Sequence, residues 1–525
     1  MLTIPTETLR RTATALQPAS GRLGRYGPPT VLVVAWLACA LTHLRLPYPS
    51  DQLHYLDAAP YFPRPIPGST IIHQMTRFGL TGPTRLVMTV VGYSEASYYF
   101  VPLLAGVLLL FGTYAIGTLL FSRWVGAAAA LVLLTYTPVF YDGTELMPDL
   151  FATGLFTCAV ALAVAVRMER LPARPWALLL IGFLLGWSYL VREFIVFVWP
   201  LILALLWARL RKDRPLWRGL LWVAAPIVVL VAGETLLCWI VYDDPLARVR
   251  AVAGHGEQVP AAVAETFHNK PRRVYAGRLW AALNGSENVY YPEHWIVRPL
   301  LFATVVGAPA RPRRLGIFGL WPALMWVPLT LLGGVIDPSA PKLRIQLIRY
   351  WFPVFPAFVL GGVAALWLIV GYLAGRRAAG RTVLPAAAVA CVAAASVFLA
   401  VGNWGRDPDV GRGERDMAAF RTWMAGHSDG VRYVWTDGMT GHVLKVFQQG
   451  PFGGRAWPAE IRALRFGAPG PASGDMVVLF DPGGTICGQC RKAAGVALGG
   501  PVQSAVSWHE VYATRDGVLR VYSVG

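Results

Sequence analysis

Apolar stretches long enough to cross a lipid bilayer dominate this sequence. A membrane-spanning helix needs about 20 consecutive, mostly apolar residues. Eleven such stretches can be read, some of them short, at about 30–46, 98–121, 125–140, 150–166, 176–191, 194–208, 217–241, 294–309, 315–335, 347–373 and 383–402. Only 14% of the residues are charged and 55% are hydrophobic, whereas about 25% are charged in a soluble domain. The sequence therefore predicts a mostly α-helical membrane protein with about 11 spans.

Basic residues gather in the connectors between these stretches, and their placement indicates the orientation of the chain. The clusters come before the first span and after the fourth, sixth, eighth and tenth, at Arg10–Arg25, Arg167–Arg170, Arg209–Arg214, Arg311–Arg314 and Arg376–Arg377. Positively charged connectors stay in the cytoplasm. We therefore expect a cytoplasmic N-terminus and an extracytoplasmic C-terminus in the plasma (inner) membrane. These connectors also explain most of the net charge of +18, so no nucleic-acid partner is expected.

The predicted topology divides the chain into a membrane domain, 1–402, and an extracytoplasmic domain, 403–525. The membrane domain carries two long outer loops, 47–97 and 242–293. The C-terminal segment reads as a small α/β domain, with a helix over 416–425, strands over 431–435 and 476–480, and a hairpin over 511–522. Cys487 and Cys490 lie in this domain and are expected to form a small disulfide rather than a zinc site.

The first outer loop holds the most informative carboxylate. Asp51 follows the first span by a few residues, so it is expected at the membrane surface. In the first turn of a helix its charge would be stabilised by the helix dipole. The alternative is a general base that accepts the proton of a hydroxyl group.

Further along this loop, 71–78 and 83–91 have the pattern of amphipathic helices that lie on a membrane surface. His73 and Arg77 would then face anions, either lipid phosphates in general or a bound ligand.

Polar residues also lie at the ends of later spans. The second outer loop, 141–149, packs three carboxylates into nine residues, including Glu145 and Asp149. Pro148 suits the start of a helix, which would place Asp149 in its first turn, either as a cap or in a polar ligand site.

Two arginines lie where apolar residues surround them. Arg192 and Glu193 stand between the fifth and sixth spans, and Arg349 and Tyr350 open the tenth. Charges inside a helix bundle, such as Arg192 and Glu193, are costly and are functional candidates, although a mutual or interhelical ion pair would also explain them. Positive charge at the outer face, as at Arg349, opposes the usual distribution of basic residues and suggests a bound anion. The planar fork of arginine suits a phosphate. Glu234, within the seventh span, is expected to need an arginine partner.

These motifs together resemble the GT-C superfamily of membrane glycosyltransferases, in the branch of the protein O-mannosyltransferases and the lipid A aminoarabinose transferase. The resemblance rests on Ser50–Ala58, Glu145–Asp149, Arg192–Glu193, Arg349–Pro353 and Tyr433–Asp437. It implies a polyprenyl-phosphate-linked sugar as donor, transfer on the outer face of the membrane, and a lipid, glycan or protein acceptor.

The resemblance also implies roles for particular residues. Asp51 would be the catalytic base, with Glu145 and Asp149 orienting the acceptor or the base. Basic residues would hold the donor phosphate, with Arg192, Arg349 and His73 as the candidates. The other candidates for substrate binding are Tyr55, Arg77, Glu193 and Tyr350. No cofactor is certain and a divalent cation is possible, with no metal ligands assigned.

Two other interpretations remain open at this point. A transporter or flippase of a lipid-linked or polar solute would explain polar residues in spans without a base, but transporters commonly carry inverted repeats, and none is visible. An enzyme similar to the O-antigen ligases would use a polyprenyl-pyrophosphate donor instead.

Overall fold

The computed structural model describes most of the chain in two compact units. The described residues are 22–44, 47, 51–67, 70–213, 216–254, 268–283, 292–343, 345, 347–375, 380–404, 414–437, 440–441, 444–445, 448, 457–464, 470–480 and 508–525. The first unit comprises Met1–His43, Thr70–Leu80 and Val101–Gly405. The second comprises Leu44–Ser69, Thr81–Phe100 and Arg406–Gly525.

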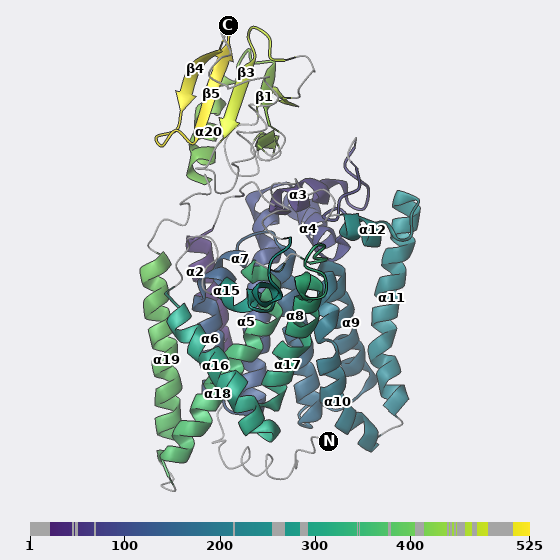
Figure 1. Ribbon diagram of the computed structural model, residues 1–525, viewed down its shortest axis with the longest axis vertical. Coiled ribbons are helices and arrows are strands. Elements are labelled where there is room, and N and C mark those ends of the chain that lie inside the picture. The colour runs from purple at the N-terminus through teal and green to yellow at the C-terminus, as the bar shows by residue number, and fades with distance from the viewer. Residues whose placement is uncertain are drawn as a thin grey trace. The chain divides into compact units, whose positions relative to one another are not determined.

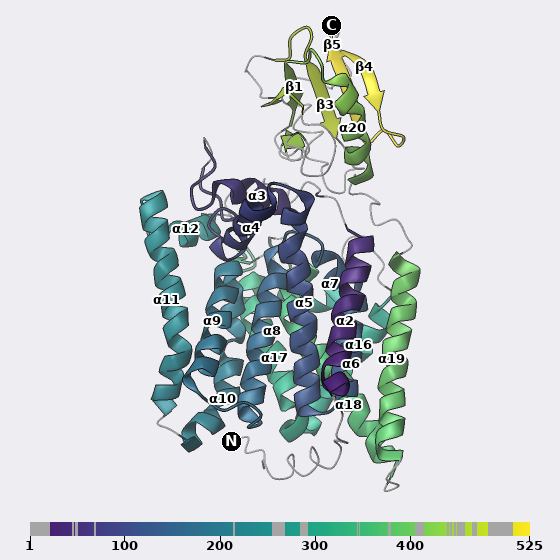
Figure 2. The same cartoon turned by 180° about the vertical axis from the view of Figure 1, so that it is seen from behind.

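The first unit is a bundle of helices that run roughly side by side (Figures 1 and 2). Its elements are α2 (Arg22–Thr42), α5 (Glu95–Leu120), α6 (Arg123–Thr135), α7 (Thr137–Asp142), α8 (Pro148–Arg167), α9 (Pro175–Val191), η2 (Glu193–Val198), α10 (Pro200–Asp213), α11 (Leu216–Tyr242), α12 (Ala247–Gly254), α14 (Arg272–Ala276), α15 (Arg278–Leu283), α16 (His294–Ala310), α17 (Pro312–Thr330), η3 (Leu331–Val335), η4 (Ile348–Val354), α18 (Phe355–Leu373) and α19 (Gly380–Trp404). All eleven predicted apolar stretches fall on these helices.

Six helical segments of this unit are long and apolar enough to cross a membrane. They are Glu95–Leu120, Pro148–Arg167, Trp217–Tyr242, Pro312–Val335, Ile348–Leu373 and Thr382–Val401. Shorter apolar helices cover Gly27–Thr42, Arg123–Thr135, Pro175–Val191 and Glu193–Trp207. The chain is therefore a multi-pass membrane protein, as predicted.

Two of the apolar stretches start with a tight 3₁₀ turn instead of a regular α-helix. The sixth begins as η2 before α10, and the tenth begins as η4 before α18. Because a 3₁₀ turn winds more tightly than an α-helix, the side chains at these two positions are aimed differently from those of a continuous span. Arg192 and Arg349, two of the predicted site residues, lie at these breaks.

Small residues allow close contacts between helices of the bundle. A Cβ atom on Gly182 of α9 would lie 2.0 Å from the carbonyl oxygen of Val223 on α11. A Cβ atom on Gly79 would lie 2.6 Å from backbone atoms of Leu190 and Val191 at the end of α9. Only glycine permits backbones to approach this closely, so residues around Gly79 are held against the end of α9.

The expected helix over 71–78 is wrong, because residues 73–76 form a turn and α4 begins only at Phe78 and runs to Val91. The hydroxyl of Thr76 donates to the carbonyl oxygen of His73 at 3.0 Å, a local bond that competes with the helical pattern. The helix expected over 83–91 is confirmed within α4.

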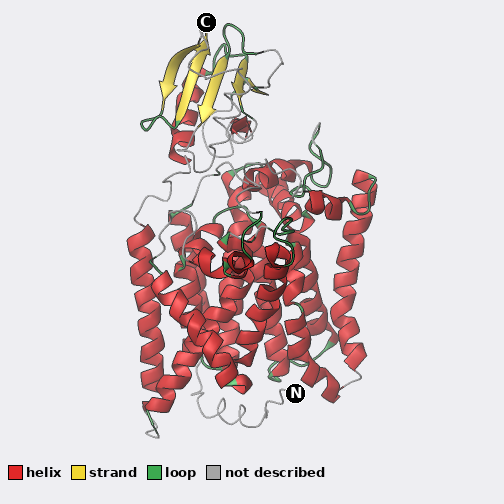
Figure 3. Ribbon diagram, in the orientation of Figure 1, coloured by secondary structure: helices red, strands yellow, loops and turns green. Residues whose placement is uncertain are grey.

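The second unit contains α3 (Asp51–Ala58), η1 (Ala59–Tyr61) and most of α4. It also contains α20 (Glu414–His427) and five strands, β1 (Tyr433–Thr436), β2 (Glu460–Ala463), β3 (Met476–Phe480), β4 (Trp508–Ala513) and β5 (Leu519–Val524). In the described part of the chain, strands occur only in this unit (Figure 3).

The five strands form one mixed sheet in the order β2-β1-β3-β5-β4. β1 pairs in parallel with β2 and β3, whereas β5 pairs antiparallel with β3 and β4. Met417, Phe420 and Met424 of α20 are buried, which confirms the apolar face expected for this helix. The expected α/β character and the C-terminal hairpin are also confirmed. Strand β2 was not predicted, and the cysteines at 487 and 490 lie outside the described residues.

Candidate active site

Asp149 lies at the start of α8, where two arginines approach it. Pro148 occupies the first turn of the helix, as predicted, and Asp149 follows it. Its carboxylate is almost fully buried and lies 3.0 Å from Nε of Arg192 and 3.9 Å from Nε of Arg349. A buried carboxylate needs such compensation, because an unpaired charge is very costly away from water.

Arg192 is held between aromatic rings as well as by its ion pair. Its guanidinium carbon lies 4.6 Å from the centre of the Phe194 ring and 4.9 Å from that of Tyr350. Cations attract the negatively polarised faces of such rings. We call Asp149, Arg192 and Arg349, with the rings of Phe194 and Tyr350, the Asp149 cluster.

Two further acids adjoin this cluster. Burial, followed by the nearby charges of Asp149 and Glu145, raises the pKa of Asp142 well above its ordinary value. The charge of Arg349 acts in the opposite direction.

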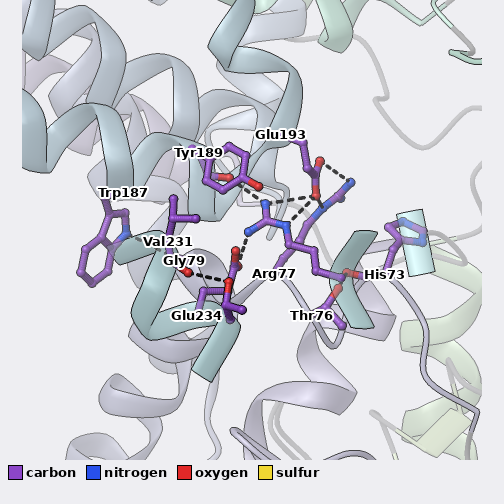
Figure 4. Close-up of polar contacts among 11 residues, drawn as sticks. His73, Thr76, Arg77, Gly79, Trp187, Tyr189, Glu193, Val231 and Glu234 are labelled. Atoms are coloured by element: carbon purple, nitrogen blue, oxygen red, sulfur yellow. Dashed lines mark hydrogen bonds and ion pairs between the residues drawn. The ribbon is translucent and has the colours of Figure 1, made fainter. Parts of the chain in front are cut away.

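Glu193 points into a different set of contacts (Figure 4). Its carboxylate receives two hydrogen bonds from Arg77, at 3.3 and 3.4 Å, and others from Arg248 at 3.1 and 3.3 Å. Arg248 also pairs with Glu234 and donates to the carbonyl oxygen of Tyr189 at 2.7 Å. We call Arg77, Glu193, Glu234, Arg248 and the Tyr189 carbonyl the Glu193 network.

The Glu193 network confirms the prediction for Glu234 and includes one residue, Arg248, that was not a candidate from the sequence. Glu234 has the arginine partner that was expected for it. That partner, Arg248, comes from α12 in the second long outer loop, and no sequence pattern distinguished it from other arginines. The side chain of Arg248 is only 5% exposed. The alternative of an interhelical ion pair at Arg192 and Glu193 is confirmed. Arg192 pairs with Asp149, and Glu193 pairs with Arg77 and Arg248.

The remaining candidates divide between the two units. Asp51 is the first residue of α3, in the first turn as expected, and Tyr55 is buried in the same helix. His73 and Arg77 are both buried in the first unit, so Arg77 is not part of a solvated helix face. Its charge is compensated by Glu193.

Within the described part of the chain, no group of three or more His, Cys, Asp or Glu side chains is arranged to hold a metal ion. Asp149 in the second outer loop is instead paired with arginine.

The fold is similar to that of solved protein structures. It is similar to ArnT from Cupriavidus metallidurans bound to undecaprenyl phosphate, with a TM-score of 0.59 and 14% sequence identity, over 96% of this chain and 98% of the other. The apo state of that protein gives a TM-score of 0.55 at 14% identity, over 94% of this chain and 98% of the other. The chain thus has the fold of a GT-C glycosyltransferase.

Sequence comparison agrees with the fold. Residues 84–239 match the family described as dolichyl-phosphate-mannose-protein mannosyltransferase. No curated protein shows significant sequence similarity to the chain. The resemblance to the GT-C superfamily that the motifs indicated is therefore confirmed.

Proposed function

We propose that this protein is a membrane glycosyltransferase that moves a sugar from a polyprenyl-phosphate donor to an acceptor hydroxyl group on the outer face of the membrane. The observation that carries the proposal is the Asp149 cluster. Two arginines converge at the outer-loop end of α8 within a fold similar to that of ArnT bound to undecaprenyl phosphate. Charges placed in a membrane bundle at such cost are expected to serve a ligand.

The two arginines suit the departing phosphate. Donors that face the developing negative charge stabilise the transition state, and a guanidinium group can offer two parallel hydrogen bonds to a phosphate. The side chain of Arg349 is 21% exposed and that of Arg192 is 7% exposed, so Arg349 is the more accessible of the two proposed phosphate contacts. Glu145 and Asp149 would hold the arginines and orient the acceptor.

Asp51 is proposed as the base. It would take the proton of the acceptor hydroxyl while that oxygen forms a bond to C1 of the sugar and the bond from C1 to the phosphate oxygen breaks. The phosphate leaves with the electron pair. Attack from the side opposite the phosphate would invert the anomeric centre. Tyr55, His73 and Tyr350 remain proposed contacts of the substrate, whereas Arg77 and Glu193 would contribute to substrate binding indirectly, through the ion pairs that they form.

The proposal includes the predicted orientation, with a cytoplasmic N-terminus and an extracytoplasmic C-terminal domain in the plasma membrane. It leaves the acceptor as a lipid, a glycan or a protein. A divalent cation remains possible as a cofactor.

The proposal is tested with a panel of polyprenyl-phosphate sugars and mass spectrometry of the products. The purified wild type should transfer a sugar from at least one donor, and Asp51→Asn should abolish transfer while the melting temperature stays unchanged. Asp57→Asn is the matched control, because it removes another carboxylate of the same helix, α3, and it should keep transfer.

Two results would count against the proposal. Transfer at the wild-type rate by Asp51→Asn would show that Asp51 is not the base. Movement of a polyprenyl-phosphate lipid across vesicle membranes, with no glycosylated product from any donor, would favour a flippase.

A further inference from the structure

The Asp149 cluster and the Glu193 network are joined by consecutive residues. Arg192 ends α9 with an extended backbone (φ −148°, ψ 120°), and Glu193 begins η2. The ion pairs show that Arg192 turns towards Asp149, whereas Glu193 turns towards Arg77 and Arg248.

The Glu193 network fixes this break from two sides. Arg77 contacts both carboxylate oxygens of Glu193. On the same side, the indole nitrogen of Trp187 donates to the carbonyl oxygen of Gly79 at 3.1 Å, and Gly79 lies against the backbone at the end of α9 (Figure 4). The segment before α4 is thus bound to the last turn of α9.

Arg248 holds the break from the other side. Its guanidinium group contacts Glu193, Glu234 and the carbonyl oxygen of Tyr189, and its central carbon lies 4.8 Å from the centre of the Tyr189 ring. These partners belong to η2, α11 and the last turn of α9. One planar group with several fixed donors can satisfy them together, whereas the single ammonium group of a lysine cannot.

The charges of the network are balanced. Two arginines face two glutamates, and three of the four side chains are no more than 6% exposed. Such a closed set has little capacity left for a ligand. These ion pairs instead fix the backbone at the α9–η2 break, from which Arg192 projects.

We propose that Arg248 is a positioning residue, which holds Glu193 and so fixes the α9–η2 break that aims Arg192 at Asp149 and at the donor phosphate. The contact between Arg192 and the donor phosphate rests on the proposed function. The second long outer loop thereby contributes to the site without touching the substrate.

The first experiment measures binding of undecaprenyl phosphate to the purified full-length protein. Arg248→Lys keeps the positive charge but replaces the planar guanidinium group by a single ammonium group. We expect its dissociation constant to rise about tenfold, a loss of about 1.4 kcal/mol, together with a moderate decrease in melting temperature from the hydrogen bonds that lysine cannot replace. Arg250→Gln is the matched control on α12, because the Arg250 side chain is 71% exposed and pairs only with nearby Asp244 in the described structure. It should bind like the wild type.

The kinetic pattern separates positioning from a general loss of folding. In Arg248→Lys, the donor KM should rise while the acceptor KM stays unchanged, because only Arg192 is displaced. A merely structural role would reduce the amount of active enzyme and leave both constants of the folded fraction unchanged, and that result would overturn the proposal.

The second experiment does not depend on enzymatic activity. Arg248→Gln is introduced into the wild type and into a protein that already carries Arg192→Met and Asp149→Asn, and the melting temperatures are compared. If Arg248 supports the Arg192–Asp149 pair, its loss should lower the melting temperature less where that pair is absent. Equal decreases in both backgrounds would overturn the positioning role.

The two proposals can fail separately. If the wild type binds no undecaprenyl phosphate and transfers no sugar, the proposed function fails, and the comparison of melting temperatures still decides the role of Arg248. If the wild type binds and transfers but Arg248→Lys matches it in every constant, only the positioning role fails.

Discussion

Replacing Arg192 by methionine removes the guanidinium group 3.0 Å from Asp149 and keeps a long apolar side chain beside Phe194 and Tyr350. Breaking a buried ion pair by removing one partner costs about 3–5 kcal/mol. Arg349 remains 3.9 Å from the other Asp149 oxygen, which favours the lower end of this range. We therefore expect Arg192→Met to destabilise the protein by about 3 kcal/mol, roughly a hundredfold in the folding equilibrium.

The companion variant carries Asp149→Asn in addition to Arg192→Met. Replacing both members of a buried pair by neutral groups is often close to neutral for stability. The double variant should therefore recover most of the stability that Arg192→Met loses. The assay is reversible unfolding of the purified protein in detergent micelles, followed by tryptophan fluorescence as denaturant is added.

The double variant also separates folding from ligand binding. It should fold like the wild type and yet bind undecaprenyl phosphate more weakly, because one of the two proposed phosphate contacts, Arg192, is gone. A loss of less than about 1 kcal/mol in Arg192→Met would fall in the range of exposed ion pairs and refute the reasoning. A double variant less stable than either single variant would refute it as well.

Three further predictions concern other parts of the molecule. Arg349→Ala should raise the donor KM about tenfold or more and leave the acceptor KM unchanged, since a hydrogen bond to a charged group contributes about 1.5–3 kcal/mol; steady-state kinetics with each substrate varied measures this. Gly182→Ala should lower the melting temperature strongly, because its Cβ atom would lie 2.0 Å from the carbonyl oxygen of Val223. Burial and the nearby Asp516 raise the pKa of Asp416 to about 6, whereas the pKa of Asp516 is lowered. The stabilisation from protonated Asp416 is therefore lost as pH rises through about 6, and hydrogen exchange of α20 in the full chain should show less protection above that pH.

Each of these predictions has a control or an opposing result. An unchanged donor KM in Arg349→Ala would contradict its role at the phosphate. Gly233→Ala on α11 is the control for Gly182→Ala, because no atom lies within 4 Å of its added Cβ, and it should change little. Asp416→Asn mimics the protonated acid, so in this variant the protection of α20 against hydrogen exchange should no longer decrease above pH 6. If the decrease persists, a group other than Asp416 causes it.

Local sequence rules predicted the elements whose cause is local. Eleven apolar stretches fall on helices because burying backbone polar groups in lipid requires a helix. Pro148 begins α8 and places Asp149 in its first turn, since proline fits the first helical position. The apolar face of α20, with Met417, Phe420 and Met424, followed from a spacing of three and four residues.

The partners of the charged residues followed no local rule. The sequence indicated that Glu234 needs an arginine, but several were available, and nothing in the pattern selected Arg248. It also left open whether Arg192 and Glu193 pair with each other. The tertiary structure decided that question, because it brings Asp149 to Arg192, and Arg77 and Arg248 to Glu193.

The sequence by itself determined that this chain crosses a membrane many times, ends in a small α/β domain and concentrates its polar residues near the ends of spans. These properties depend on composition and on periodicity within single elements. Only the tertiary structure decided which charges meet, because an ion pair such as Arg77 with Glu193 joins residues far apart in the chain. The same holds for the Asp149 cluster, whose arginines come from two breaks between spans.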